Sequence, residues 1–257
     1  MSIFVRVSRG FCALSICLTS LTAQLVGLYP ACPAQAKVSS EKPEKSSKES
    51  KESKASKETK KADPAAFALG QKVLEAIGGY EKFKAFNDKP CRASGKIIQT
   101  SGLSGNKNTF DCQLLLKREK EKITITMLGQ PLVTVYDGKV CWTQQGDTVV
   151  PADAITAKRI EEDINHGLLL LESLHSPNTR MELGKPQTID GKACDTLIVY
   201  FTDGKPTNFA VDKETHLVLA SSYPGVDLEQ GLSTDKTYHY ADYRKIEGTM
   251  QPYKVLE

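Results

Sequence analysis

The chain has 257 residues, of which 34 are Lys or Arg and 31 are Asp or Glu, and its formal net charge is +3. This near balance gives no electrostatic argument for binding nucleic acid, where a concentrated basic surface would be expected, so we expect no nucleic-acid partner. The four histidines show no zinc-ligand spacing, and the sequence lacks a P-loop, a nucleophile elbow and a dinucleotide-binding glycine motif between a strand and a helix. We therefore expect a protein that is not an enzyme and needs no cofactor or metal.

The first 36 residues have the features of an export signal. Arg6 and Arg9 precede an apolar stretch from residue 11 to residue 28, and Ala34 and Ala36 form an A-x-A pattern typical of a cleavage site. We expect residues 1–36 to be a cleaved signal peptide and the protein to reach the periplasm or cell envelope. Two alternatives stay open. The stretch could be kept as a membrane anchor, although it is barely long enough to span a bilayer, or Cys32 could carry a lipid.

Residues 37–63 contain nine Lys, five Glu and one Asp, and Val38 is their one apolar residue larger than alanine. Such a segment cannot bury enough apolar surface to offset the entropy cost of ordering, so we expect a disordered linker. The remaining residues, 64–257, are enough for a single domain.

This domain is predicted to be rich in antiparallel strands. Asp63 and Pro64 favour a helix start, Gly78 and Gly79 favour its end, and residues 80–86 suggest further helical turns. After Pro90 the hydrophobic period becomes two, with Asp-Gly and other turn sequences between the segments. The predicted strands are 92–100, 109–117, 122–128, 132–136, 139–144, 147–150, 181–188, 194–202, 206–212, 216–224, 235–243 and 249–256. Evenly spaced hairpins of this kind predict a sheet that curls or closes.

Residues 152–174 interrupt the strands with a helical pattern that Gly167 divides in two. The pattern is amphipathic. One side carries Ile155, Arg159, Ile160, Ile164, Leu168 and Leu171, and the other carries Lys158, Glu161, Glu162 and Asp163.

The segment after the signal peptide keeps four cysteines, Cys91, Cys112, Cys141 and Cys194. An even number in an exported chain favours disulfides, with three possible connectivities. The spacing allows Cys91 and Cys112 to face each other across a hairpin, which would leave Cys141 for Cys194. The alternative is four buried free thiols.

Five phrases, in this order along the chain, resemble the outer-membrane lipoprotein-sorting protein family, which shares its fold with the LolA and LolB lipoprotein carriers. They are EAIGGYEKFKAF (75–86), YDGKVCW (136–142), IDGKACDTLIV (189–199), FAVDKETHLVLAS (209–221) and YADYRKIEGTMQP (240–252). The resemblance implies an α+β fold, in which a curved antiparallel sheet forms a half-open β-barrel covered by helices. It also implies a concave apolar face that holds acyl chains without catalysis.

On this reading, several apolar side chains are candidates for the ligand site, and each has ordinary core packing as its alternative. Trp142 brings a large apolar area, and Met127 suits a site that adapts to its ligand. The full set is Ile123, Ile125, Met127, Trp142, Ile160, Ile164, Leu168, Leu171, Phe209 and Val211.

The expected partners are lipids or lipoprotein acyl chains, with a membrane-bound donor or acceptor protein as a further candidate. The alternative function is a structural or sensing protein of the envelope that contacts another protein and stores no ligand.

Overall fold

The computed structural model describes residues 2–5, 63–100, 107–226 and 233–257. The predicted linker up to residue 62, and the predicted signal peptide apart from residues 2–5, lie outside these ranges. The described helices are all too short or too polar to cross a membrane.

The helices are α1 (Pro64–Ala76), α2 (Tyr80–Asp88), α3 (Ala154–His166) and the 3-10 helix η3 (Leu168–His175). The strands are β1 (Ser2–Val5), β2 (Cys91–Thr100), β3 (Lys107–Lys117), β4 (Lys120–Met127), β5 (Gln130–Tyr136), β6 (Cys141–Gln145), β7 (Thr148–Pro151), β8 (Met181–Leu183), β9 (Gln187–Ile189), β10 (Lys192–Tyr200), β11 (Pro206–Asp212), β12 (Val218–Val226), β13 (Ser233–Ile246) and β14 (Thr249–Leu256).

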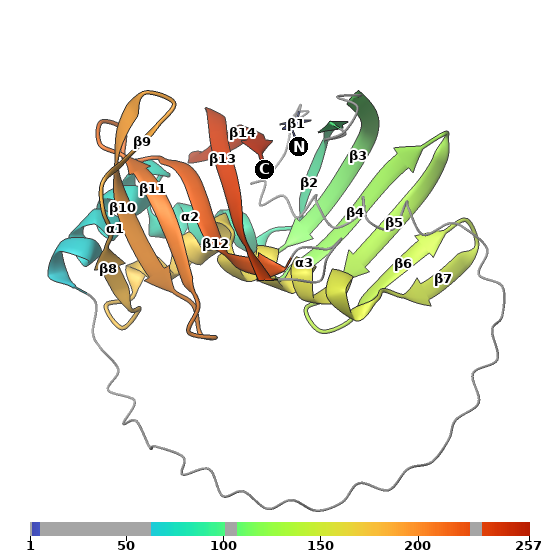
Figure 1. The fold of residues 1–257 in the computed structure, drawn as a ribbon, viewed down its shortest axis with the longest axis horizontal. Coiled ribbons are helices and arrows are strands. Elements are labelled where there is room, and N and C mark those ends of the chain that lie inside the picture. Colours follow the sequence, from blue (N-terminus) through green and yellow to red (C-terminus); the bar gives the residue numbers. More distant parts are fainter. Residues whose placement is uncertain (1, 6–62, 101–106, 227–232) are drawn as a thin grey trace, which may run out of the picture.

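The strands form one antiparallel sheet in the order β7-β6-β5-β4-β3-β2-β1-β14-β13-β12-β11-β10-β8, with β9 also paired to β10. The sheet does not close, because β7 and β8 stand at its two ends. Figure 1 shows two wings, β2–β7 and β10–β14, with α3 in the lower part of the view between them and α1 at the left beside β8 and β10. The predicted α+β class, an open antiparallel sheet with a helical cover, is therefore confirmed.

The two ends of helix α1 are set by a capping aspartate, Asp63, and by a glycine, Gly78. The Asp63 carboxylate accepts a hydrogen bond from the backbone N–H of Ala65 at 2.9 Å, which caps the first turn. At the other end, Gly78 has a φ of +113°, and a Cβ there would lie 2.3 Å from the carbonyl oxygen of Gly248. Only glycine permits this close approach, which places the end of α1 against the β13–β14 turn.

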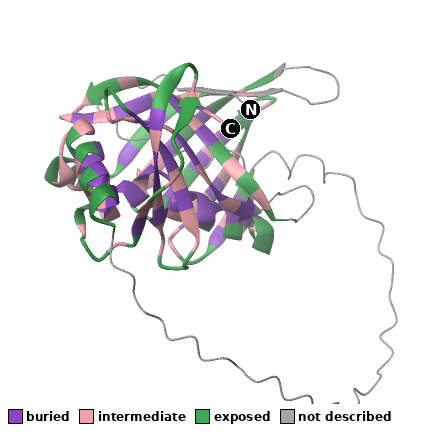
Figure 2. Ribbon diagram, turned by 60° about the vertical axis from the view of Figure 1, so that its left-hand side comes forward, coloured by how far each residue is buried: buried purple, intermediate pink, exposed green. Residues whose placement is uncertain are grey.

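The main core lies between the helices and the inner faces of both wings. It joins residues of α1 and η3 to Ile123 of the first wing and Phe209 of the second, which are 1% and 0% exposed. Figure 2 shows buried residues interspersed with exposed ones along the strands and the helices. A smaller cluster joins Tyr136 and Cys141 to helix α3.

The predicted strand 181–188 was wrong as a single element. It is divided into β8 and β9, which pair with different parts of β10. The break includes Gly184, where a Cβ would lie 2.7 Å from the Thr196 side chain. Close packing against β10 therefore requires glycine at this irregular point, which period-two alternation did not indicate.

Strand β1 comes from the predicted signal peptide. It pairs antiparallel with β2 on one side and with β14 on the other, with Ile3 opposite both Ile97 and Val255. The two wings are thus joined through a strand that cleavage after Ala36 would remove.

Candidate functional site

The inner face of the half-barrel brings together most of the apolar residues predicted for the ligand site. Both wings and the helical layer contribute to the main core, through Ile123, Ile125, Leu168, Leu171, Phe209 and Val211. Met127 is partly buried at the border of this core. Ile160 and Ile164 lie in the smaller cluster beside Tyr136 and Cys141.

Trp142 does not belong to this set. Its neighbour Cys141 is 4% exposed and packs in the cluster with α3, and side chains alternate along a strand, so Trp142 points to the opposite face. It is partly exposed there, opposite Val135 and Pro151. The expectation that Trp142 lines an inner cavity is therefore wrong, because the strand register turns it outward.

The segment Ala154–His175, which contains α3 and η3, covers part of the inner face, and we call it the cover. The face of α3 that points to the second wing is polar rather than apolar. Arg159 is 4% exposed, Asp163 is 5% and His166 is 0%. Their spacing of four and then three residues places them on one side of the helix. Together with their partners on the second wing, these three residues form what we call the latch.

Asp163 is the centre of the latch. Its carboxylate accepts hydrogen bonds from the hydroxyls of Tyr223 on β12 and, at 3.0 Å, of Tyr238 on β13. Burial raises the pKa of Asp163, even though Arg159 and the tyrosine hydroxyls favour the charged form. The Arg159 Nε lies 3.6 Å from the Asp163 Oδ2, which is an ion pair but too long for a hydrogen bond.

Arg159 also connects α3 to the end of the chain. Its Nη2 donates to the Glu257 Oε1 at 3.0 Å, and the Lys236 Nζ lies 3.1 Å from the same oxygen. Burial disfavours the charge on Arg159, but the carboxylates of Asp163 and Glu257 outweigh it, so the pKa of the guanidinium is raised.

His166 completes the latch. Its Nδ1 lies 2.8 Å from the Thr207 hydroxyl and its Nε2 lies 3.4 Å from the Asp203 carboxylate. The ring stacks on Tyr223 at a centroid distance of 5.0 Å. Burial lowers the pKa of His166 below its usual value, although Asp203 acts in the opposite direction. The imidazole is therefore neutral at neutral pH.

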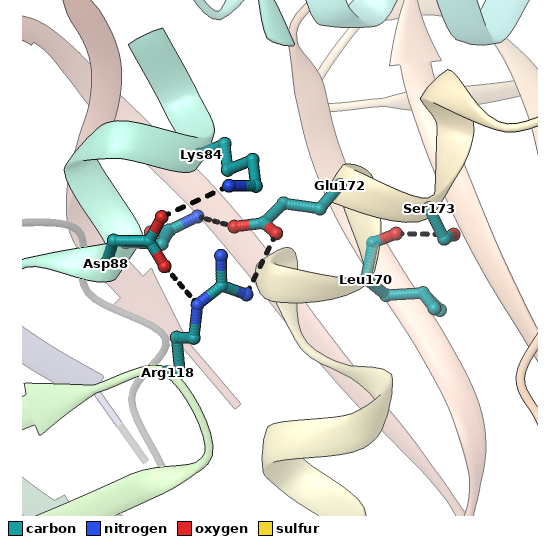
Figure 3. A network of polar contacts seen from close by, with 7 residues as sticks. Lys84, Asp88, Arg118, Leu170, Glu172 and Ser173 are labelled. Atoms are coloured by element: carbon teal, nitrogen blue, oxygen red, sulfur yellow. Dashed lines mark hydrogen bonds and ion pairs between the residues drawn. The ribbon is translucent and has the colours of Figure 1, made fainter. Parts of the chain in front are cut away.

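A second group of polar side chains attaches η3 to α2 and to the β3–β4 turn (Figure 3), and we call it the clamp. It consists of Lys84, Asn87, Asp88, Arg118 and Glu172. Arg118, in the β3–β4 turn, bridges Asp88 of α2 and Glu172 of η3, the latter at 3.2 Å. Asn87 donates to Glu172 at 2.8 Å, and Lys84 pairs with Asp88 at 3.4 Å. The cover is thus fixed at both ends by polar side chains and packed along its length on apolar ones.

These polar contacts attach the cover to the second wing and to the β3–β4 turn. In the part of the chain that the structure describes, no three His, Cys, Asp or Glu side chains lie close enough to hold a metal ion. The charged residues of the latch are paired within the fold rather than directed at an open cleft.

Sequence reasoning missed the latch because it assigned Glu162 and Asp163 to the polar side opposite the apolar residues. Both are in fact buried, at 6% and 5% exposure, whereas Ile155 is 42% exposed. The available signal was the polar stripe formed by Arg159, Asp163 and His166. This stripe indicates a buried polar contact only once it is known that Tyr223 and Tyr238, on distant strands, face it.

The expected disulfides do not form among the described residues, since Cys91, Cys112, Cys141 and Cys194 are buried free thiols. In the β2–β3 hairpin, Cys112 lies opposite Gly95 and Cys91 lies opposite Leu116. The two cysteines are therefore offset by four residues, ~13 Å along the strand, whereas a disulfide needs Cα atoms within about 7 Å. Cys141 and Cys194 lie in separate clusters on different wings. The alternative of four buried thiols is the one that the structure adopts.

Several solved structures are similar to this chain. A LolA superfamily protein from Nitrosomonas europaea has 17% identity and a TM-score of 0.47, over 71% of this chain and 82% of that protein. A DUF1329 family protein from Desulfovibrio piger has 15% identity and a TM-score of 0.44, over 73% and 82%. An outer membrane lipoprotein-sorting protein domain from Vibrio parahaemolyticus has 13% identity and a TM-score of 0.45, over 74% and 83%.

The names of the first and third of these proteins agree with the resemblance expected from the sequence phrases. No family model and no curated protein matches the chain.

Proposed function

We propose that the protein is a non-enzymatic carrier of the cell envelope that holds a lipid or a lipoprotein acyl chain between the cover and the inner face of the sheet. The observation that carries this proposal is the difference between the two kinds of contact that the cover makes. Beneath it lie apolar side chains from both wings, including Ile123 and Phe209. Its attachments at the sides are polar, through the latch and the clamp.

The energetics favour exchange of the cover for a ligand. A polar contact gives ~0.5–1.5 kcal/mol of net stability, because water replaces much of it when the contact breaks. Apolar surface has no such substitute in water, and each buried methylene contributes ~0.8 kcal/mol. An acyl chain that takes the place of Leu168 and Leu171 keeps the inner face dry while the cover moves.

Native mass spectrometry of the exported protein, purified without detergent, tests this proposal. We expect a stoichiometric adduct of lipid mass that disappears after organic extraction. A Leu168→Asp variant places a charge under the cover and should lose the adduct while circular dichroism shows a folded protein. Leu183→Asp is the matched control, because Leu183 is 45% exposed and lies on β8, away from the cover. A folded Leu168→Asp protein that keeps the adduct contradicts the proposal.

A protein-contact role without a stored ligand is the second candidate, and the end of the sheet at β7 favours it. All four residues of β7 are exposed, with Val149 at 59% and Val150 at 47%. An exposed apolar edge strand can pair with a strand of another protein. A protein with no adduct that forms a complex lost on Val150→Lys substitution would favour this role over carriage.

A further inference from the structure

The outer face of the β2–β7 wing carries a row of aligned side chains that the proposed function does not use. The register places Arg92 opposite Leu115, Leu115 opposite Lys122, and Lys122 opposite Val135. The row continues from Val135 to Trp142 and ends at Pro151 on β7. Residues that face each other across neighbouring strands share a face, so all six project away from the helical cover.

This row borders a shallow depression of about 370 Å³. The depression is lined on the outer face by Arg92, Ser94, Gln113, Leu115, Lys122 and Thr124. Arg92 and Lys122 lie two strands apart, which is ~10 Å, with the partly exposed Leu115 between them. Two cations thus flank an apolar centre.

The charge of this face is strongly one-sided. Outward positions of β2, β3 and β4 hold Arg92, Lys96, Lys117, Lys120 and Lys122. Asp111 pairs with Lys96 at 3.0 Å, and Asp137 lies close enough to Lys120 for the two charges to interact. Arg92, Lys117 and Lys122 form no ion pair within the described residues, and no carboxylate lies in the depression.

Cations beside a partly exposed tryptophan are the combination that binds a lipid surface. Lys and Arg interact with the anionic headgroups, while tryptophan prefers the interface because its ring is apolar and its N–H is polar. Trp142 lies two strands, or ~10 Å, beyond Lys122 in the same row. We propose that the outer face of the β2–β7 wing docks on an anionic phospholipid membrane, with Arg92 and Lys122 on headgroups and Trp142 at the interface. This docking surface is separate from the inner face and does not depend on whether that face holds a ligand.

Trp142 is the only tryptophan of the chain, so its fluorescence reports on this face alone. The experiment mixes the exported protein with vesicles of phosphatidylglycerol and phosphatidylcholine, and with vesicles of phosphatidylcholine alone. Co-sedimentation measures partitioning and Trp142 emission measures contact. We expect partitioning into the anionic vesicles, decreasing as salt is raised, together with a blue shift of the emission.

The double variant Arg92→Glu/Lys122→Glu should reduce anionic partitioning by at least about tenfold, since each cation near such a surface contributes ~1 kcal/mol. The matched control is Lys185→Glu/Lys245→Glu, which changes the net charge equally at exposed positions of the other wing and should partition like the wild type. The basic linker is present in every protein, so its own attraction to the vesicles cancels in the comparison. The proposal is overturned by an absence of partitioning, by equal partitioning of the two double variants, or by partitioning that leaves the Trp142 emission unchanged.

Discussion

Tyr223 and Asp163 lie 60 residues apart in the chain, and a hydrogen bond from the tyrosine hydroxyl to the carboxylate joins them across the interface between β12 and α3. Tyr238 donates to the same carboxylate oxygen from β13. The buried carboxylate of Asp163 therefore connects helix α3 to two strands of the second wing, β12 and β13. The stability of the cover should depend on how the charge of this acid is balanced.

Arg159→Met should destabilise the protein by ~3–5 kcal/mol at neutral pH, because it leaves the Asp163 carboxylate buried without its cation. The loss should shrink as the pH falls, since burial already raises the pKa of Asp163 and a protonated acid needs no cation. Urea unfolding at several pH values measures both effects. In the double variant Arg159→Met/Asp163→Leu much of the stability should return, and a double variant as unstable as the single one would contradict this account.

The contribution of His166 to the free energy of unfolding should decrease as the pH falls below 6.5. Because burial lowers its pKa in the folded state, the unfolded chain takes up the proton first. The contribution of His166 is therefore complete above the usual pKa of 6.5 and is lost below it, by at most ~1.4 kcal/mol per pH unit. His166→Gln should flatten this part of the curve, and a curve that keeps its slope in this variant would contradict the assignment.

The clamp should matter more for local opening than for global stability. Arg118 is partly exposed, and surface ion pairs typically contribute ~0–1 kcal/mol. Arg118→Gln should therefore shift the unfolding midpoint little. It should, however, accelerate hydrogen exchange in η3, because Glu172 loses its contact with the β3–β4 turn. Lys213→Gln, which removes an exposed ion pair on the other wing, is the control and should not affect η3.

The four thiols of the domain should be inert while the protein is folded. Burial raises the pKa of Cys112 and of Cys141 to about 11, so little thiolate is present at neutral pH. Alkylation in denaturant without reductant should add four groups to a chain that lacks residues 1–36, and native alkylation should be slow. Fewer than four adducts that rise to four after reduction would show that disulfides form in the exported protein.

The sequence predicted those features that depend on neighbouring residues. The cap at Asp63, the end of α1 at Gly78 and the division of the cover at Gly167 follow from local backbone chemistry, and so does most of the strand pattern. Features set by distant contacts were not predictable in this way. Trp142 faces outward because α3 occupies the other side of β6, and Asp163 is buried because Tyr223 and Tyr238 meet it there.

Strand β1 lies within the segment that the sequence predicts to be an export signal. Its four residues belong to the segment expected to direct the chain to the export machinery, yet in the folded sheet their backbone is paired to β2 and β14. If the chain completed this sheet before export, the first residues of the predicted signal peptide would be paired within the fold and inaccessible to the export machinery. Translocation would then have to precede folding. Removal of residues 1–36 would make this order irreversible, because a domain without β1 could not form the β1–β2 and β1–β14 pairs again.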